Sequence, residues 1–585
     1  MNIRSILTGS FFLLAAATAV HADKYVRFNQ VGYDPASAKR IVIIATEDCS
    51  GLPWSVKDAS GSVVASGTIG KSLCGKGVYT AFPYNYEFHF DNVKNEGSYT
   101  VDIKSIAPFS INVKKDPFKS AIQSTLHWLR VTRSGSYDAI DHGVSHLGDT
   151  ASKVMRRSCD TDTNCNKVWY VDTIHPKTLN VVGGWYDAGD YIKFTLTASF
   201  TAYMILRSYE AYPEIFEKHN SRTEYVDVLD EAKWGLDWLM KTMPDNDTNE
   251  FVIEVASEED HNIGDRLPEY DTTIQGRYRP ALSALSQPQM GLTAAALALG
   301  ADVFGKLGKN DIAAKYKAKA ELIYRRAISK DALKVPAYLD AETNPFYQDL
   351  KPEDDLELAA TELYRVTGEK HYLDDARHFA SIAKTCGNIS WADMNQFAHL
   401  RLYEIDSSAV KAYVGEDISD YIEHSKQSGN IWSQPVDFDW ACLYNMMNVA
   451  STSIMYEKET GNHRTHEMVQ NIVDYLFGTN SWGESFVALK GVHSIEHPNS
   501  LIYRLQCDKF PEGAIAEGPS DIKSHTEEDA WFGFDPACEP TAPFNTGSGI
   551  FYDQVDDYVC METCGYGVAE GLFLLTLMCK TESAK

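Results

Sequence analysis

The spacing of apolar residues changes once along this chain, near Asp116–Pro117, and this change limits the fold more than any other feature of the sequence. Before it, stretches such as Arg40–Ala45 and Gly97–Ile103 are rich in β-branched residues or alternate apolar and polar positions, which is typical of strands. After it, apolar residues recur at helical spacing, as in Leu229–Met243. An acidic residue followed by proline is itself a helix start signal. The sequence therefore predicts a small all-β part followed by a large all-α part.

Residues 23–114 contain several short strand-like stretches separated by Gly, Asn and Pro clusters, which is the pattern of a β-sandwich. In residues 115–585, helix-like stretches follow one another, and two of them end alike, at Gly368 and Gly461. Glycine is the usual residue after a helix end. Repeated helix–turn–helix units over roughly 450 residues favour a toroid or a solenoid, and helical periodicity alone does not separate a closed barrel from an open array.

Residues 1–22 have the organisation of a secretory signal peptide. Arg4 provides the positive start, an apolar stretch follows, and Val20-His21-Ala22 is a small-residue cleavage site. The apolar stretch is shorter than the roughly 20 residues that a membrane-spanning helix needs. We therefore expect cleavage near Ala22 and a secreted or periplasmic protein without a membrane span.

The charge and the cysteine content indicate which class of partner the protein can bind and in which compartment it resides. The chain carries 54 Lys+Arg against 81 Asp+Glu, a net charge of −27, which argues against a nucleic-acid partner because phosphate binding needs a basic face. Eleven cysteines fit an oxidising compartment. Cys560 and Cys564 have no further cysteine or histidine nearby in the sequence to complete a zinc site, and they are interpreted as small buried apolar side chains. Connectivity is not fixed by sequence, and three pairs are candidate disulfides: Cys49 with Cys74, Cys159 with Cys165, and Cys507 with Cys538.

The stretch from Gly183 to Asp190 carries the most specific chemistry. Its carboxylates, Asp187 and Asp190, lie three positions apart beside Trp185 and Tyr186. This pattern predicts an acidic pocket with aromatic walls, on which the apolar faces of neutral sugars stack, and two close carboxylates can share and orient a water molecule. The alternative is an Asp/Gly surface turn, which the preceding Gly-Gly-Trp-Tyr disfavours.

A second stretch, Phe551–Tyr566, contains Glu562, the only charged residue between Asp557 and Glu570. Its neighbours are apolar or weakly polar, and such surroundings raise the pKa of a carboxyl group, as a general acid needs near neutrality. The alternative is an ordinary solvated glutamate at a helix start. Together the two stretches provide a carboxylate pair and a distant carboxylic acid. Glycoside hydrolases use such groups, one to protonate the leaving oxygen and another to activate water or to attack carbon.

The chain resembles glycoside hydrolase family 9, in the subgroup with an N-terminal immunoglobulin-like domain. Asn29–Tyr33 is similar to the start of that domain, Gly184–Asp190 matches the family's water-activating motif, and Phe551–Glu562 has the spacing of its C-terminal signature. The resemblance implies a small all-β immunoglobulin-like sandwich over residues 23–114 and a large all-α (α/α)6 barrel over residues 115–585.

The resemblance also implies a reaction and the residues that perform it. Family members hydrolyse β-1,4-glucans with inversion, usually by internal cleavage, so a β-glucan polysaccharide or oligosaccharide is the expected partner and no cofactor is required. Asp190 would be the catalytic base, Asp187 would help to hold the water, Glu562 would be the general acid, and Asp553 would orient the substrate or the acid. Three residues are the candidate substrate-binding side chains: Trp185, Tyr186 and His497.

The sequence departs from the family pattern before the C-terminal signature. Asn499 and Leu501 stand where the family has a substrate-contacting His and an Arg. His497 and Arg504 are candidates to replace them, although a lone histidine is more often structural. Two alternatives to an endoglucanase therefore stay open: an exo-acting cellodextrinase or glucosaminidase on the same fold, and a non-catalytic carbohydrate-binding protein.

An oxygen-rich stretch contains Asp160, Asp162 and Asn164, and many members of the family bind calcium. Calcium takes six or more oxygen ligands, and only three side chains are present here. A solvated loop is therefore the alternative. We expect no catalytic metal and keep a structural calcium ion as a candidate.

Overall fold

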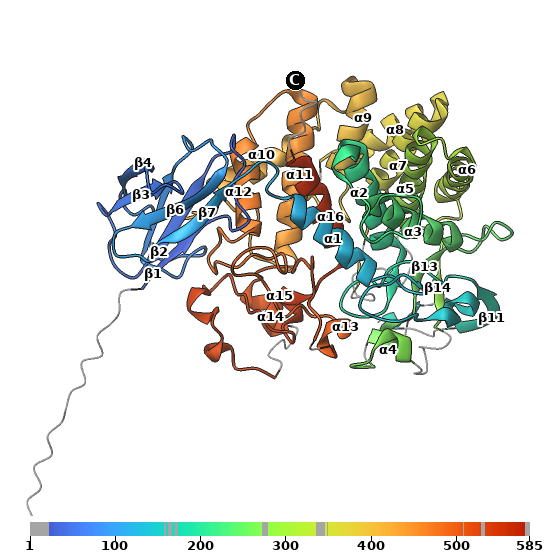
Figure 1. Cartoon of the computed structure of the whole chain (residues 1–585). Coiled ribbons are helices and arrows are strands. Elements are labelled where there is room, and N and C mark those ends of the chain that lie inside the picture. Colours follow the sequence, from blue (N-terminus) through green and yellow to red (C-terminus); the bar gives the residue numbers. More distant parts are fainter. Residues whose placement is uncertain are drawn as a thin grey trace, which may run out of the picture.

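Figure 1 shows the computed structural model of the chain. It describes residues 23–156, 159–161, 167–169, 173–261, 263–271, 279–334, 346–347, 349–385, 387–506, 508–527 and 533–579. The predicted signal peptide, residues 1–22, lies outside the described residues. Several other predicted features also lie outside them: Cys165, Cys507, and the side chains of Cys159, Asp160, Asp162 and Asn164.

Residues 23–114, all of which are described, fold into two antiparallel sheets. One sheet has the strand order β1-β2-β5 and the other the order β4-β3-β6-β7. Ile41, Val56 and Val101 belong to one shared core, so the two sheets form a sandwich. The strand bounds are β1 Lys24–Arg27, β2 Arg40–Ala45, β3 Pro53–Lys57, β4 Val63–Thr68, β5 Tyr84–His89, β6 Gly97–Ile103 and β7 Phe109–Val113.

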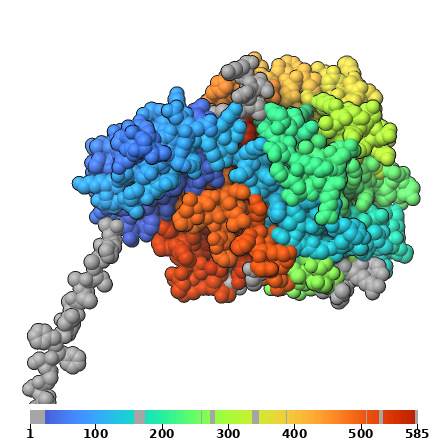
Figure 2. Space-filling view, viewed as in Figure 1, coloured from blue at the N-terminus to red at the C-terminus, as the bar shows by residue number. Residues whose placement is uncertain are grey.

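Strand β2 belongs to two cores at once, because successive side chains of a strand point to opposite faces. Ile41 and Ile43 lie in the sandwich core, whereas Val42 and Ile44 lie in the core of the helical part. All six residues of β2 are buried. The sandwich therefore packs directly against the helical part, as the blue and orange surfaces of Figure 2 show.

Within the described residues, six helices of the large part contact one another in a closed ring, in the order α2, α5, α7, α9, α11 and α16, with α16 returning to α2. Further helices pack against members of this ring, among them α1, α3, α6, α8, α10 and α12. The bounds are α1 Lys119–Val131, α2 Thr195–Ala211, α3 Asp227–Thr242, α5 Gln287–Lys306, α6 Asn310–Ala327, α7 Pro352–Thr367, α8 Lys370–Ala383, α9 Asn395–Val410, α10 Glu416–Ser425, α11 Cys442–Thr460, α12 His466–Leu476 and α16 Gly565–Leu577. The predicted order of a β part and a large helical part is confirmed.

The large part is not purely helical, contrary to the sequence prediction. Its described residues include a sheet with the strand order β11-β8-β14-β13-β12. These strands lie singly in the connections between helices, so no succession of strand-like stretches marks them in the sequence. The bounds are β8 Ser152–Arg156, β11 Thr173–Leu179, β12 Lys193–Phe194, β13 Val252–Val255 and β14 Ala281–Ser283.

The predicted disulfide between Cys49 and Cys74 is wrong, since both thiols are free. The buried Cys49 sulfur lies 3.6 Å from the carbonyl oxygen of Glu47, whereas the Cys74 sulfur faces Gly429 of the helical part at 3.8 Å. Cys538, another of the predicted partners, is also free and exposed. In the part of the chain that is described, no helix has the length and apolar character needed to cross a bilayer.

Candidate active site

A cavity of 840 Å³ brings together the two stretches that the sequence analysis selected. Gly189 and Asp190 line it from the first stretch, and Tyr558 and Glu562 line it from the second. The backbone N–H of Gly189 donates a hydrogen bond to Glu562 Oε1 at 3.1 Å. The carboxyl groups of Asp190 and Glu562 therefore face the same space although 371 residues, 191 to 561, lie between them in the sequence.

The carboxylate of Asp190 has a partner on each oxygen. Oδ1 accepts a hydrogen bond from the backbone N–H of Ile192 at 3.1 Å, and Oδ2 lies 2.5 Å from Nδ1 of His261. His261 itself lines the cavity. These contacts fix the orientation of the Asp190 carboxylate at the cavity wall.

Asp187 lies behind this wall rather than on it. Its Oδ1 accepts a hydrogen bond from the Thr197 hydroxyl, and its side chain is 7% exposed. Burial raises the pKa of Asp187 to about 8, and the hydroxyls of Thr197 and Tyr347 oppose that rise in part. Asp187 is therefore a largely protonated neighbour of Asp190 at neutral pH while the cavity holds no substrate.

Glu562 follows directly after helix α15 (Tyr558–Met561) and is its C-cap residue. Burial, followed by the negative charge of Asp190, raises the pKa of Glu562 to about 7. This agrees with the apolar neighbours seen in the sequence. A carboxyl group with that pKa is half protonated at neutral pH, as a general acid requires.

The segment that departs from the family pattern joins the two catalytic stretches through its backbone. The N–H of Leu501 donates to the carbonyl oxygen of Gly189 at 2.8 Å, and the N–H of Asn499 donates to the carbonyl oxygen of Met561 at 2.8 Å. Asn499 and Leu501 also line the cavity. A Cβ atom at Gly189 would lie 2.6 Å from Asn499 Oδ1, so only glycine permits this close approach.

Asp553 and His497 lie next to each other, and neither is among the described residues that line the cavity. The two oxygens of Asp553 accept hydrogen bonds from the backbone N–H groups of Glu496 and His497, each at 2.9 Å. Asp553 thus holds the loop that leads to Asn499. Arg504, the other candidate replacement, instead forms an ion pair with Asp556 at 2.6 Å.

Trp185 and Tyr186 are buried and do not belong to the described lining of the cavity. The Trp185 Nε1–H donates to Glu231 at 2.8 Å, and the Tyr186 hydroxyl lies 2.6 Å from Ser145. This corrects the expectation that these two rings form the pocket walls. The rings that do line the cavity are His261, Phe346, Tyr347, Trp391, Trp440, Tyr558 and Tyr566.

Sequence reasoning missed a further carboxyl group in the cavity, that of Glu517. It lines the cavity, is 3% exposed and accepts a hydrogen bond from the Cys564 thiol at 3.3 Å. Burial and the neighbouring Glu562 raise its pKa well above the usual range. No local motif surrounds Glu517, and its apolar neighbours Ala514–Ala516 were the one available signal.

A buried ion cluster, also missed, supports the loop that carries Asp187 and Asp190. Asp149 pairs with Lys193 at 2.6 Å and with Arg279 at 2.7 Å, and all three side chains are at most 1% exposed. Lys193 also donates to the carbonyl oxygens of Val181 and Gly183. The cluster therefore ties both ends of the loop together.

We expect Asp149→Asn to lower the stability of the protein by about 3–5 kcal/mol, because it leaves two buried cations without their counter-charge. Urea unfolding followed by tryptophan fluorescence measures this. Asp247→Asn is the matched control, since Asp247 pairs with Lys177 at a partly exposed position, where an ion pair contributes about 0–1 kcal/mol. Equal shifts in the two variants would contradict a structural role for the buried cluster.

Three buried carboxyl groups lie near the start of α7, those of Asp354 and Asp355 in its first turn and that of Asp349 just before the helix. Four oxygen atoms of Asp349, Asp354 and Asp355 are buried and have no hydrogen-bond partner among the described residues. Burial raises the pKa of each group, and the charges of neighbouring aspartates add to the rise. Hard oxygen ligands without partners suit a divalent cation such as calcium.

A cavity lined by carboxyl groups and aromatic rings is the kind of site that glycoside hydrolases use. The family model described as "Glycosyl hydrolase family 9" matches residues 118–575. The model described as "Cellulase N-terminal ig-like domain" matches residues 21–107. The chain belongs to glycosyl hydrolase family 9.

The chain is similar at low identity to several enzymes named endoglucanases and to one named a cellulose 1,4-beta-cellobiosidase, from Acetivibrio thermocellus, which is 24% identical. Endoglucanase C of Cellulomonas fimi is 26% identical over 557 residues, which cover 88% of this chain and 49% of that protein. Endoglucanase D of Acetivibrio thermocellus is 23% identical, with 82% of this chain and 75% of that protein covered. The chain thus spans about half the length of the first relative.

Solved structures share the fold over almost the whole chain. A metagenome-derived glycoside hydrolase family 9 endoglucanase has a TM-score of 0.73 at 21% identity and covers 94% of this chain and 98% of its own. A thermostable endoglucanase variant from Alicyclobacillus acidocaldarius has a TM-score of 0.75 at 19% identity, with coverages of 95% and 99%. At these identities, the similarity to the solved structures shows that the fold is shared.

Proposed function

We propose that the protein is an exported, inverting glycoside hydrolase that cleaves β-1,4-glucosidic bonds within cellulose or related β-glucans. The observation that carries the proposal is the meeting of Asp190 and Glu562 in one cavity, where the amide of Gly189 binds the Glu562 carboxyl group. Membership of family 9 and the names of its relatives support the same activity.

In this proposal Glu562 is the general acid and Asp190 the general base. Glu562, whose pKa is about 7, protonates the leaving glycosidic oxygen, while Asp190 removes a proton from the water that attacks the opposite face of the sugar. Asp187 helps to hold that water from behind Asp190. Asp553 acts indirectly, because its two oxygens hold the loop that precedes Asn499.

The architecture that we propose has three parts. A signal peptide over residues 1–22 is removed on export, residues 23–114 form an immunoglobulin-like sandwich that buttresses the enzyme, and residues 115–585 form an (α/α)6 barrel. The closed ring of helices and the outer helices packed against it support the barrel. The shared strand β2 supports the buttress.

The test is to incubate purified protein with cellohexaose and carboxymethylcellulose and to follow the anomeric configuration of new ends by proton NMR. We expect the α-anomer first, together with a rapid loss of viscosity in carboxymethylcellulose. Initial release of the β-anomer would contradict inversion, and release of sugar at constant viscosity would contradict internal cleavage.

One observation favours an amino-sugar substrate as the second candidate. Glu517 adds another buried carboxyl group to the cavity. Its raised pKa favours the neutral form in the empty cavity, and a protonated amino group would favour the ionised form by pairing with it. Glu517→Gln should then lower kcat/KM on glucosamine oligosaccharides by at least about tenfold, the effect of about 1.4 kcal/mol, and leave cellohexaose hydrolysis within a few-fold. Equal effects on both substrates would contradict the amino-sugar candidate.

A non-catalytic binding protein is disfavoured because Asp187, Asp190 and Glu562 are all present.

We also propose that Asp349, Asp354 and Asp355 hold a structural calcium ion. Calcium at about a hundredfold excess over its Kd should stabilise the protein by about 2.7 kcal/mol relative to the chelated form. Thermal unfolding with EDTA and with added calcium measures this. Asp355→Asn should abolish the difference, whereas Asp311→Asn, in the first turn of α6, should keep it; an identical calcium response in both variants would contradict the site.

A further inference from the structure

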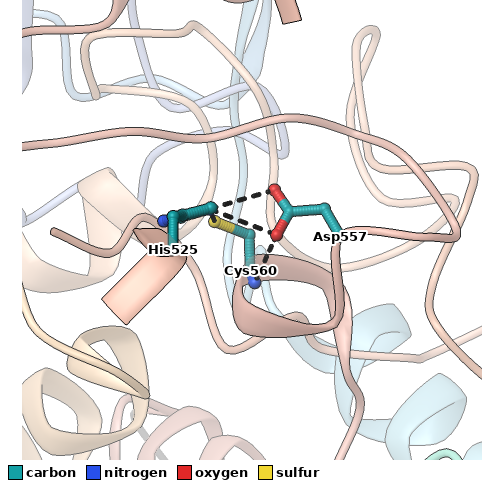
Figure 3. A group of neighbouring side chains, drawn as sticks. All are labelled: His525, Asp557 and Cys560. Atoms are coloured by element: carbon teal, nitrogen blue, oxygen red, sulfur yellow. Dashed lines mark hydrogen bonds and ion pairs between the residues drawn. The ribbon is translucent and has the colours of Figure 1, made fainter. Parts of the chain in front are cut away.

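Three buried side chains that the proposed reaction does not use meet beside α15 (Figure 3). His525 belongs to α14 (Ile522–Glu527), Asp557 is the N-cap residue of α15, and Cys560 lies within α15. Each of the three is at most 1% exposed. None of them is among the described residues that line the cavity.

One nitrogen of His525 faces both other groups. Its Nε2 lies 3.2 Å from Asp557 Oδ1 and 3.5 Å from Cys560 Sγ. The other ring nitrogen, Nδ1, lies 3.0 Å from the carbonyl oxygen of Asp521. Because a carbonyl oxygen only accepts hydrogen bonds, Nδ1 carries the ring hydrogen. In its neutral form the imidazole presents the lone pair of Nε2 to a carboxylate and a sulfur atom, so three electron-pair donors converge.

This geometry does not suit nucleophilic catalysis. In a Cys-His-Asp triad the two ring nitrogens have different partners, one the nucleophile and the other the carboxylate. Here Nε2 faces both the sulfur of Cys560 and the carboxylate of Asp557, and the cluster is closed off from the cavity. Convergence on one nitrogen is the arrangement expected around a metal ion.

We propose that His525, Asp557 and Cys560 bind a zinc ion. Zinc accepts imidazole, carboxylate and thiolate ligands in tetrahedral geometry. Zn–S and Zn–N/O bonds of about 2.3 Å and 2.0–2.1 Å place sulfur and nitrogen about 3.5 Å apart and nitrogen and oxygen about 3.3 Å apart. The distances in the cluster are 3.5 Å and 3.2 Å. The bond from Nδ1 to a backbone carbonyl is the usual support for a zinc-bound histidine.

The charges also balance with zinc in place. When the metal binds, the Cys560 thiol releases its proton to solvent and the Zn–S bond forms, which gives a thiolate, the Asp557 carboxylate and a neutral imidazole around Zn²⁺. The buried cluster is then neutral. Without the metal, the Asp557 carboxylate keeps the hydrogen bond from the Cys560 N–H at 3.3 Å, but its buried charge has no counter-charge within the cluster unless His525 is protonated. The carbonyl oxygen of Ile550 lies 3.4 Å from the same sulfur and offers a fourth ligand.

The position of the cluster gives the ion a structural role. Two of the ligands belong to α15 and its N-cap, and the residue that ends this short helix is Glu562. The ion would join α14 to α15 and so hold the helix that positions the Glu562 carboxyl group. The inference rests on the cluster alone and does not depend on which sugar the cavity accepts.

The test is the zinc content of the full-length protein after dialysis, measured by atomic emission for the parent, His525→Gln, Cys560→Ser and Cys579→Ser. Cys579 is a matched control, since it is also a buried free thiol but lies at the C-terminal end of α16. We expect the first two variants to lose one equivalent of zinc relative to the parent and Cys579→Ser to lose none. Equal zinc content in all four proteins, or none in the parent, would overturn the proposal.

A second measurement uses the parent protein and does not require the variants to fold. Alkylation of cysteines is followed by peptide mass spectrometry before and after treatment with a zinc chelator. We expect the chelator to increase labelling of Cys560 several-fold and to leave labelling of Cys579 unchanged. Unchanged labelling of Cys560 would show that no metal protects this sulfur, which would also overturn the proposal.

Discussion

Replacing Glu562 with glutamine is expected to lower kcat on cellohexaose by about 10²–10⁴-fold, the usual contribution of a general acid. The amide keeps an oxygen that can accept the hydrogen bond from Gly189, so the loop contact survives. What the variant loses is the proton for the leaving oxygen. A substrate whose leaving group needs no proton, such as a dinitrophenyl cellobioside, should therefore be hydrolysed at close to the parent rate.

The comparison of the two substrates is the measurement, and Glu570→Gln is the control. Glu570 is also fully buried with a pKa well above its usual range, and it bonds to Asn448 away from the cavity. Glutamine resembles the protonated glutamic acid there, so activity should persist. An equal loss on both substrates in Glu562→Gln would contradict the role of general acid.

The pH dependence of the parent enzyme follows from the pKa of Glu562, which is about 7 against an ordinary value of 4.5. The acid must be protonated to act, so kcat/KM should fall as pH rises through about 7, and Glu562→Gln should lack this limb of the pH profile.

The stability of the protein should depend on the same group, because the pKa of Glu562 is higher in the folded protein than in the unfolded chain. The contribution of the protonated Glu562 to stability is fully present below pH 4.5 and is lost as pH rises through 7. At pH 8 the glutamine variant should therefore be more stable than the parent by about 3 kcal/mol.

Replacing Asp190 with alanine is expected to remove the base and to lower kcat by a similar factor, about 10²–10⁴. A better leaving group should not rescue this variant, because the missing step is activation of water. Azide, which needs no base, can occupy the space that the carboxylate leaves. It should restore turnover and give an α-glycosyl azide, since it attacks from the face that the water used.

The product of the azide reaction is the measurement for Asp190, and proton NMR distinguishes the two anomers. Asp265→Ala is a suitable control, because Asp265 carries a carboxylate that pairs with Arg504 outside the described cavity lining. It should keep the parent rate and give no azide product. A β-glycosyl azide from Asp190→Ala would show that Asp190 is not the base of an inverting enzyme.

The sequence predicted the parts of the site whose signals are local. Asp190 and Glu562 each lie in a short stretch with unusual neighbours, and the structure brings both to one cavity. Trp185 was assigned to the cavity because it precedes Asp187, but its ring packs on Gly235, where a Cβ atom would lie 2.1 Å from it. The direction of a side chain in a loop depends on distant packing, which a local pattern does not contain.

Residues from distant segments were missed for the same reason. Trp391, Trp440 and Glu517 reach the cavity from three separate connections, and no spacing links them in the sequence. The sheet that includes β8 and β14 was missed because its strands are scattered between helices and its pairing joins residues 127 positions apart, as in Ala281 with Val154. The two-part division at Asp116 was visible because strand-like stretches fill residues 23–114 and stretches with helical spacing recur over the hundreds of residues that follow.

The two backbone hydrogen bonds of the Asn499–Leu501 segment act as a spacer between the loop of the base and the helix of the acid. Main-chain groups are the same for nearly every amino acid, so the side chains of this segment can change while the separation of the two carboxyl groups is kept. That separation decides whether a glycosidase inverts or retains configuration. In the proposed enzyme, the side chains of these three residues are therefore available to tune substrate choice, while their main-chain groups keep the separation on which the stereochemistry depends.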